Sequence, residues 1–359
     1  MRSGDRNGLP ELVDEIGSLG NELGREINIM EVCGTHTVSL RKHGIHTLIP
    51  SNVRLLSGPG CPVCVTPSSY ISNAVELIEK HDVLVTTFGD MLKVPDHTGK
   101  SLASYMGRGN LRILYSPAEL LAIARETERE VVFLGVGFET TIPVVASAFL
   151  RAEKEGIGNL FLYPAFKLVP PALHALLEDP ECRIDAFLLP GHVSAVLGLE
   201  PYAFLDTEYG IPSAVAGFEG DDLLTGIHAL LRQLAEGTHR VENIYTRVVR
   251  ERGNEKARKV MDSFLTPSDS LWRGFGNIPA SGMFPLPEYG KLDAAAKYNL
   301  PKLTNTDPPG CLCSRVVQGK SLPEECTLFG KRCTPENPVG PCMVSSEGSC
   351  AAHFKYGAL

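Results

Sequence analysis

The chain has 359 residues, of which 43% are hydrophobic, so it is long enough for two or three domains with buried cores. Its net charge is −8 and it has no Lys/Arg tract, which argues against a nucleic-acid-binding protein. No apolar run approaches the ~20 residues of a membrane span, and residues 1–20 lack the apolar stretch of a signal peptide. We therefore expect a soluble cytoplasmic protein with neither a membrane nor a nucleic acid as partner.

The apolar periodicity predicts strands alternating with helices, after an amphipathic helix over residues 10–23. The predicted strands cover residues 27–32, 53–56, 83–87, 112–115, 131–136, 160–163, 184–189 and 213–216. The predicted helices cover residues 68–80, 117–128, 141–154, 171–178 and 221–236. This alternation favours an α/β fold, with parallel sheets covered by helices on both faces.

The predicted elements divide into two consecutive Rossmann-like units that face a cleft, at residues 27–116 and 117–240. The remainder, residues 241–359 together with the helix at 10–24, is expected to form a small irregular domain. From Pro267 onward, proline, glycine and aromatic residues interrupt the periodicity, so we expect little regular structure there.

Glycine-rich or polar turns follow six of the predicted strands, at residues 33–36, 58–64, 87–90, 137–140, 190–194 and 217–219. Parallel sheets bind ligands at the carboxyl ends of their strands, so these turns suggest a shared cleft. We expect several acidic or basic residues near these turns to be caps or solvated loop residues, namely Asp90, Asp96, His97, Glu139 and Glu219. His192 is a better candidate for function because proline and glycine shape the backbone before it.

Three cysteines and one histidine fall on the first two of these turns. The spacing of Cys61 and Cys64 suits a reversible disulfide or the chelation of one metal ion by both sulfurs. Cys33 and His36 lie at a strand-to-helix turn, where thiolate and imidazole would share a metal or the histidine would activate the thiol. These residue types indicate redox or metal chemistry more than structural packing.

Six of the ten cysteines crowd into a segment that has few core-forming residues: Cys311, Cys313, Cys326, Cys333, Cys342 and Cys350. Such a segment needs a staple, which four cysteines on one iron–sulfur cluster would provide. Two zinc ions or disulfides are the alternatives. Cys182 stands alone and is expected to be a packing residue. The sequence has neither a dinucleotide fingerprint nor a Walker motif, so nucleotide binding lacks support.

Taken together, the motifs resemble those of the HypD family of hydrogenase maturation factors, from about Ile27 to the end of the chain. The matching motifs are Cys33-Gly34-Thr35-His36-Thr37, Gly58-Pro59-Gly60-Cys61-Pro62-Val63-Cys64, Thr87-Phe88-Gly89-Asp90-Met91, Gly137-Phe138-Glu139-Thr140-Thr141, Pro190-Gly191-His192-Val193-Ser194 and, in the tail, Cys333-Thr334-Pro335-Glu336 and Cys342-Met343-Val344-Ser345. One departure is Asp96, which follows Pro95 where the family pattern has glycine.

The resemblance implies a scaffold on which the Fe(CN)2CO group of nickel–iron hydrogenases is assembled. It also implies a small chaperone partner, HypC, and a cyanide donor, HypE. By the same match, Cys33 and His36 would hold the iron being decorated, and Cys61 and Cys64 would be its redox-active and metal-proximal pair.

The family's cluster spacing, C-x14-C-x6-C-x16-C, implies a 4Fe-4S cluster on Cys311, Cys326, Cys333 and Cys350, with Cys313 or Cys342 as substitutes. Two other classes of function remain open from the residues. An iron–sulfur-dependent protein disulfide reductase would use the tail and the CxxC pair but not Cys33. A zinc-binding interaction module would use the tail alone.

Overall fold

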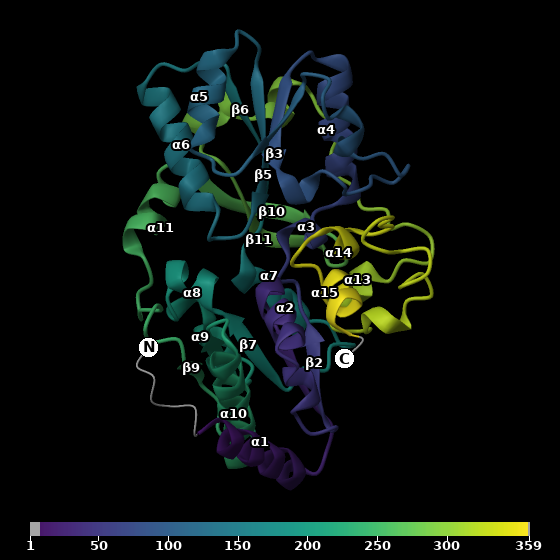
Figure 1. Cartoon of the computed structure of the whole chain (residues 1–359). Coiled ribbons are helices and arrows are strands. Elements are labelled where there is room, and N and C mark those ends of the chain that lie inside the picture. The colour runs from purple at the N-terminus through teal and green to yellow at the C-terminus, as the bar shows by residue number, and fades with distance from the viewer. Residues whose placement is uncertain (1–7, 358–359) are drawn as a thin grey trace.

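The computed structural model describes residues 8–357, which form two parallel β-sheets and an antiparallel ribbon (Figure 1). The strands are β1 Ile27–Glu31, β2 Val53–Ser57, β3 Leu84–Phe88, β4 Leu111–Leu114, β5 Val131–Gly137, β6 Leu160–Phe166, β7 Ala186–Pro190, β8 Ser213–Ala216, β9 Val241–Asn243, β10 Leu265–Trp272 and β11 Gly276–Pro285. The predicted α/β fold with parallel sheets is confirmed, and all eight predicted strands are present.

The helices follow the predicted amphipathic segments closely, with additional short ones at the turns and in the tail. They are α1 Leu9–Leu23, α2 Gly34–Lys42, α3 Pro62–Val65, α4 Ser68–Lys80, α5 Glu119–Glu126, α6 Ile142–Lys154, α7 Val169–Leu177, α8 Gly191–Leu197, α9 Ala203–Thr207, α10 Gly220–Glu236, α11 Glu255–Asp262, α12 Ala294–Lys297, α13 Cys313–Val316, α14 Pro341–Val344 and α15 Ser349–Tyr356. Among the described residues, none of these helices has the length and apolar character that a membrane span requires.

The strands pair differently from the consecutive grouping that the sequence suggested. The larger sheet has the order β2-β1-β7-β8-β9, and the smaller one has the order β4-β3-β5-β6. Residues 27–116 and residues 117–240 therefore each contribute strands to both sheets. After β2 the chain leaves the larger sheet, completes the smaller one, and returns as β7, where Ala186 pairs with Ile29 of β1. Hydrophobic periodicity predicts that a strand is buried but not which strand lies beside it.

The two sheets form separate lobes, which Figure 1 shows one above the other. In the larger sheet, Ile27 and Ile29 of β1 pack against α1 and α10 on one face. Met30 of the same strand points to the opposite face, where α7, α8 and α9 pack. This alternation along β1 is the period of two that buries both faces of a central parallel strand.

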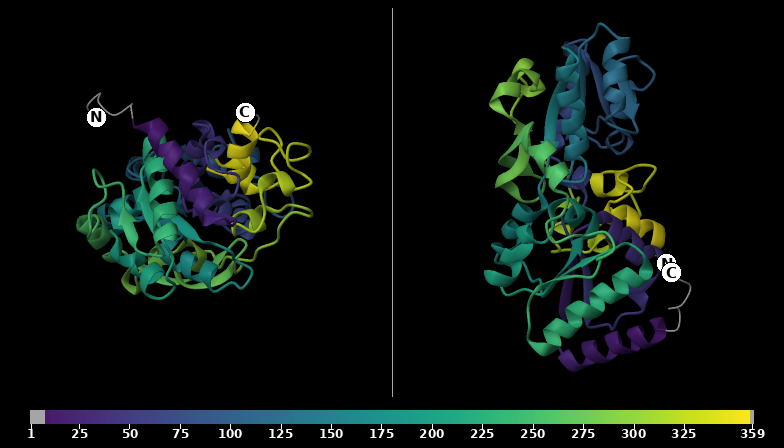
Figure 2. Two further views of the ribbon diagram at one scale, coloured as in Figure 1. Left: turned by 90° about the horizontal axis from the view of Figure 1, so that it is seen from below. Right: turned by 90° about the vertical axis from the view of Figure 1, so that its left-hand side faces the viewer.

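The smaller sheet is covered by different kinds of segment on its two faces. Helices α5, α6 and α11 pack on one face, around Phe133 and Phe149. Helix α4 packs on the other face, and the same core also contains tail residues, including Cys313, Cys342 and Cys350. The cysteine-rich tail thus packs on the core of the smaller sheet, and its helices α15 and α14 contact α2 and α3. The right-hand view of Figure 2 shows the yellow tail beside the purple N-terminal segments.

The ribbon β10–β11 was not expected, because proline and glycine interrupt the periodicity of this segment. It pairs Leu265 with Pro285 and contacts both β6 and α7, so it connects the two lobes. Lys167, just after β6, is fully buried and donates a hydrogen bond of 2.9 Å to the carbonyl of Leu271 in the ribbon. The short strand β9 was also missed, because three residues are too few to show a period.

Candidate functional site

Cys33 lies between the end of β1 and the start of α2, at the carboxyl edge of the larger sheet. The backbone N–H groups of Thr35 and His36 act to lower the pKa of its thiol. Burial, and secondarily the carboxylate of Glu347, nevertheless raise the pKa of Cys33 to about 11. The thiol is therefore protonated at neutral pH, and a nearby cation would favour the thiolate.

Two glycines let three separate segments meet around Cys33. The N–H of Gly34 donates to the carbonyl of Gly60 at 3.0 Å. A Cβ atom on Gly60 would lie 2.4 Å from the Cα of Cys33, and one on Gly34 would lie 2.2 Å from the carbonyl oxygen of Glu347. The Thr35 hydroxyl also donates to the Glu347 carboxylate at 2.8 Å. The two predicted turns and the tail are thus in backbone contact at one point.

The His36 ring is turned toward the end of β8. Its Nε2 lies 3.3 Å from the carbonyl oxygen of Ala216, while Nδ1 has no partner among the described residues. Complete burial lowers the pKa of His36 to about 4, so the imidazole is neutral. The rings of His36 and His192 lie 4.8 Å and 3.9 Å from that of Phe218, so the structure brings both histidines to one aromatic side chain.

Cys61 and Cys64 form a disulfide across the start of α3. The pair is deeply buried, with exposed fractions of 4% and 1%. Both cysteines belong to the hydrophobic core that also contains Cys313, Cys342 and Cys350 of the tail. The Gly60 turn thus connects the disulfide to the backbone beside Cys33, and the disulfide shares its hydrophobic core with the tail cysteines.

Arg273, between β10 and β11, connects the CxxC turn to the tail. Its side chain is 1% exposed, yet it bonds the carbonyl of Thr66 at 3.2 Å and the carboxylate of Asp307 at 2.7 Å. Its backbone N–H also donates to the carbonyl of Val65 at 2.8 Å. The positive charge of Arg273 further helps to lower the pKa of Cys342, after hydrogen bonds from Cys313 and Cys350. Sequence reasoning gave no signal for this arginine.

The tail cysteines converge around Gly340. A Cβ atom on this glycine would lie 2.6 Å from the sulfur of Cys313 and 2.7 Å from that of Cys311. The neighbouring thiols of Cys313 and Cys350 lower the pKa of Cys342. The Val339 N–H donates to the sulfur of Cys333 at 3.3 Å.

Cys326 contacts the tail backbone rather than another sulfur, with its thiol 3.6 Å from the carbonyl oxygen of Gly310. That carbonyl belongs to the residue before Cys311. In residues 8–357 as they stand, no three His, Cys, Asp or Glu side chains form a closed metal-binding group. The gathering of thiols and an inward-facing N–H donor fits a thiolate-ligated iron–sulfur cluster in its donor chemistry.

The acidic residues at the strand ends have different environments. Glu219 caps α10 in a capping box with Asp222, as expected. Asp96 is neither a helix cap nor solvated, because it is buried and its carboxylate accepts the backbone N–H groups of Thr98 and Lys100 within its own loop. Asp90 instead accepts a hydrogen bond of 3.1 Å from Ser346 and so holds the tail against the end of β3.

Glu139 requires a correction, since the sequence suggested a cap or a solvated residue. Its carboxylate accepts the N–H of Val169 at 2.8 Å, but the side chain is fully buried and its second oxygen has no partner among the described residues. Burial raises the pKa of Glu139 to about 7. Ser194 and Tyr202, whose hydroxyls are also buried without partners in this part of the chain, were not candidates from the sequence. Their only sequence signal was the position of Ser194 in the turn after β7.

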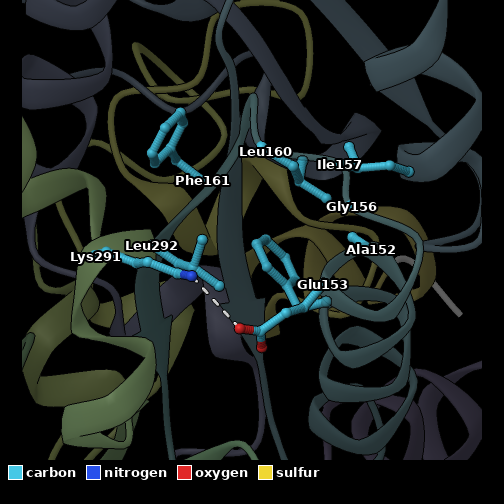
Figure 3. A pocket seen from close by; sticks show the side chains of 10 residues that line it. Ala152, Glu153, Gly156, Ile157, Leu160, Phe161, Lys291 and Leu292 are labelled. Carbon is cyan, nitrogen blue, oxygen red and sulfur yellow. Dashed lines mark hydrogen bonds and ion pairs between the residues drawn. The ribbon is translucent and has the colours of Figure 1, made fainter.

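A cavity of the described residues lies away from these groups. It has a volume of about 340 Å³, lies between α6, β6 and the segment around Leu292, and is lined largely by apolar side chains (Figure 3). Glu153 and Lys291 form an ion pair of 3.4 Å beside it. A second cavity, of about 250 Å³, is lined partly by Cys182, which is half-buried as a packing residue would be. Neither cavity contains a residue of the predicted site.

Comparison with known proteins bears on the whole chain. A family model described as HypD, Hydrogenase formation hypA family, matches residues 9–357. The chain belongs to the HypD family. Hydrogenase maturation factor HypD2 of Bradyrhizobium diazoefficiens is 42% identical over 337 residues, which cover 91% of this chain and 89% of the relative. Hydrogenase maturation factor HypD of Escherichia coli is 42% identical over 334 residues, covering 92% and 90%.

A third HypD relative, from Rhizobium leguminosarum, is 40% identical over 360 residues, covering 95% of this chain and 94% of its own length. The family match covers all of the turns on which the resemblance rested, from Cys33 to the tail. The family predicted from the motifs is thus confirmed.

Proposed function

We propose that this chain acts in the maturation of nickel–iron hydrogenases, as the scaffold on which the Fe(CN)2CO group is assembled. In this proposal Cys33 holds the iron that is the cargo, with His36 beside it and the Cys61–Cys64 pair close by. HypC-type chaperones would share the iron, and a HypE-type protein would deliver cyanide. The work would take place in the cytoplasm.

The observation that carries the proposal is the position of the disulfide. Cys61 and Cys64 lie in one core with four tail cysteines, and the Gly60 turn before them contacts the backbone of Cys33. The contact of the Gly60 turn with the Cys33 turn and the core shared with the tail cysteines support a two-electron centre between the proposed iron site and the proposed cluster site. A reductive assembly reaction needs such an arrangement, because electrons have to pass from the cluster through the dithiol pair to the iron site.

The proposed transfer balances with two electrons. A thiocyanate carrier, R–S–CN, plus Fe(II) and two electrons gives iron-bound cyanide and the thiolate R–S⁻. The Cys61 and Cys64 dithiol supplies both electrons as its S–S bond forms, and releases two protons. The disulfide state of the structure is then the state after transfer.

The 4Fe-4S cluster, when bound, would return electrons to this pair. We propose Cys311, Cys326, Cys333 and Cys350 as its ligands, with Cys313 or Cys342 as substitutes. The closeness of Cys311 and Cys313 at Gly340, and of Cys342 to Cys313 and Cys350, supports a cluster in this part of the tail and favours the substitutes Cys313 and Cys342. The remaining two thiols would then be neighbours of the cluster.

The experiment is an infrared spectrum of the protein, purified anaerobically with its HypC-type partner, in the cyanide and carbonyl stretching region. We expect bands from both ligands in the wild type, and their loss in Cys33→Ser. Cys182→Ser, which removes a thiol distant from the site, is the matched control and should keep the bands. A bare spectrum from a preparation with an intact cluster would contradict the scaffold function.

A protein disulfide reductase is the alternative function. Its substrate would have to reach Cys61 or Cys64, and the deep burial of both sulfurs disfavours this. Replacement of Cys33 also distinguishes the two functions, because only a scaffold would lose iron that is not part of the cluster. Metal analysis tests the zinc-binding module, since iron with inorganic sulfide excludes it.

A further inference from the structure

The segment from Arg247 to Lys259 is strongly basic, although the protein as a whole is acidic. It starts after β9 and runs into α11, and its cations are Arg247, Arg250, Arg252, Lys256, Arg258 and Lys259. Six cations thus stand against two carboxylates, in a chain whose net charge is −8. Arg250, Arg252, Lys256 and Lys259 are exposed. We call residues 247–259 the basic segment.

Most cations of the basic segment have no carboxylate partner. Arg247 forms an ion pair with Asp222, whereas the other five form none among residues 8–357. Arg258 instead donates a hydrogen bond of 2.8 Å to the backbone carbonyl of Arg252, which brings two positively charged residues together. Like charges repel one another, so stability of the fold does not explain this concentration of cations.

The basic segment also places a cation at the less stable end of a helix. Lys256 lies in the first turn of α11, two residues after the N-cap Asn254. The N-terminus of a helix carries a partial positive charge, so an acidic side chain would be more stable at this position. Departures from local preference of this kind are expected at functional surfaces. The charges of the basic segment are therefore better explained by a binding partner than by folding.

The backbone of the basic segment is fixed to α8, the helix that contains His192. The N–H of Asn254 donates to the carbonyl of Val196 at 3.0 Å. A Cβ atom on Gly253 would lie 2.3 Å from the backbone nitrogen of Gly198, so the two chains are in direct contact at the end of α8. The cations are thus presented on a backbone with a defined position beside the candidate site.

The basic segment begins at the aromatic side chains of the candidate site. The Arg247 guanidinium lies 4.5 Å from the centre of the Tyr245 ring. That ring is 6.1 Å from the ring of Phe218, which both His36 and His192 approach. At its other end, α11 contacts α6 of the upper lobe as well as α8 of the lower lobe (Figure 1). A partner bound to the basic segment would therefore lie across both lobes, next to the site.

We propose that the basic segment is the docking surface for a protein partner with an acidic face. Exposed cations without partners attract such a face over about 8–10 Å at ordinary salt concentrations. Val248, which is 44% exposed in the same segment, adds an apolar side chain that a protein can bury. Glu251 and Glu255 would repel the phosphates of a nucleic acid, so a protein is the better fit. The inference rests on the proposed function, since that function supplies the partners for the test.

The test measures the binding of the full chain to HypC-type and HypE-type proteins of the same organism by surface plasmon resonance. The variant Arg252→Gln/Lys256→Gln/Lys259→Gln removes three exposed cations from the basic segment. For the partner that docks there, we expect the association rate constant to fall about tenfold at 50 mM NaCl. At 400 mM NaCl the fall should be less than about twofold, because salt screens exposed charges.

The matched control is Lys93→Gln/Arg183→Gln/Lys302→Gln, which changes the net charge equally at exposed residues outside the basic segment. The control should keep both association rates within about twofold of the wild type. Equal falls in the two variants would mean that the partners respond to net charge alone, and this would overturn the docking surface. Unchanged rates for both partners in the basic-segment variant would overturn it as well.

Two further measurements distinguish the remaining explanations. If a DNA or RNA oligonucleotide binds the wild type but not the basic-segment variant, while the partner rates stay unchanged, the surface binds nucleic acid and the proposal is wrong. Infrared spectra of the same proteins test the scaffold function separately. Cyanide and carbonyl bands together with unchanged partner rates would overturn only the docking surface. A wild type without bands, but with partner binding that depends on the basic segment, would overturn only the scaffold function.

Discussion

The molecule holds its cysteines in two different ways. At the carboxyl edge of the larger sheet, Cys33 and Cys61 follow strands β1 and β2, and close contacts at Gly34 and Gly60 hold their turns together. In the tail, Cys311, Cys313 and Cys342 lie among turns and four-residue helices, and the sulfurs contact one another. In the first region the sheet positions the thiols. In the second region, which has little regular structure, the thiols and the metal centre that they would bind hold the tail segment in its fold.

The two arrangements suit the two roles proposed for these thiols. A scaffold that receives a metal ion and releases it has to keep its shape in both states, which a sheet edge with buried backbone contacts allows. A segment that keeps a resident cluster can depend on it for its structure. Substitutions in the Cys33 and Gly60 turns, in the tail and at the contact between them should therefore change stability and metal binding to different extents.

The largest loss of stability is expected where the Gly60 turn meets the Cys33 turn. Gly60→Ala would place a methyl group 2.4 Å from the backbone of Cys33 and force the turns apart. We expect a loss of about 3 kcal/mol in the free energy of unfolding, measured by urea denaturation. Gly158→Ala, at a site with no atom within 4 Å, is the control and should change stability by less than ~0.5 kcal/mol. Equal stability of the two variants would mean that the close backbone contact between Gly60 and Cys33 does not hold the two turns together.

The next effect concerns the junction between the two regions. Asp307→Ala would leave Arg273, which is 1% exposed, without its carboxylate, and Asp307 itself is 26% exposed. Because Asp307 is partly solvated, we expect a loss of about 2 kcal/mol, which is less than the ~3–5 kcal/mol for breaking a fully buried ion pair. Glu126→Ala breaks the exposed Arg112–Glu126 pair and should cost less than ~0.5 kcal/mol. If both variants lose the same small amount, Arg273 does not tie the tail to the CxxC turn.

A smaller effect is expected on the reactivity of Cys33. The carboxylate of Glu347 helps to raise the pKa of Cys33 to about 11, so Glu347→Gln should lower this pKa. Burial still acts, so the pKa should stay above the ordinary value of 9.0. The alkylation rate of Cys33, followed by mass spectrometry from pH 8 to 11, measures the shift. Glu336→Gln is the control. An unchanged pH profile of the alkylation rate would show that the charge of Glu347, in the tail, does not influence the Cys33 thiol.

The smallest effect is expected for a cysteine outside both regions. Cys182 is half-buried and has no cysteine neighbour in its cavity, so Cys182→Ser should cost less than ~1 kcal/mol in thermal unfolding. Its bound iron and sulfide should equal those of the wild type, whereas Cys350→Ser should lose cluster iron. Loss of iron in Cys182→Ser would assign this cysteine to one of the two regions after all.

Much of the fold was predictable because it depends on local periodicity. The segments at 68–80 and 213–216 match α4 and β8 residue for residue. The ribbon β10–β11 was not predictable, since Pro267 and the glycines beside its turn obscure the alternation of an antiparallel pair. Its Trp272 and Ile278 are buried by contacts with α7 and with the larger sheet, which no local pattern encodes.

The candidate site was predictable to the extent that its residues are chemically unusual. Cysteines and glycines at strand ends are enough to single out Cys33 and the CxxC pair from the sequence alone. Glu139, Ser194 and Tyr202 are ordinary residues whose significance comes from burial without partners among the described residues. Arg273 likewise becomes informative only as a buried charge between the CxxC turn and the tail.

The sequence by itself determined the strands and helices that have a clear apolar period, the family and the list of reactive thiols, because each is recorded in residue type and short-range spacing. The tertiary structure decided which strands pair, that β7 returns beside β1, and that the tail packs on the CxxC core. These are contacts between residues that lie far apart in the chain. They are selected by the burial of whole surfaces and the satisfaction of polar groups, which are properties that no short stretch of sequence contains.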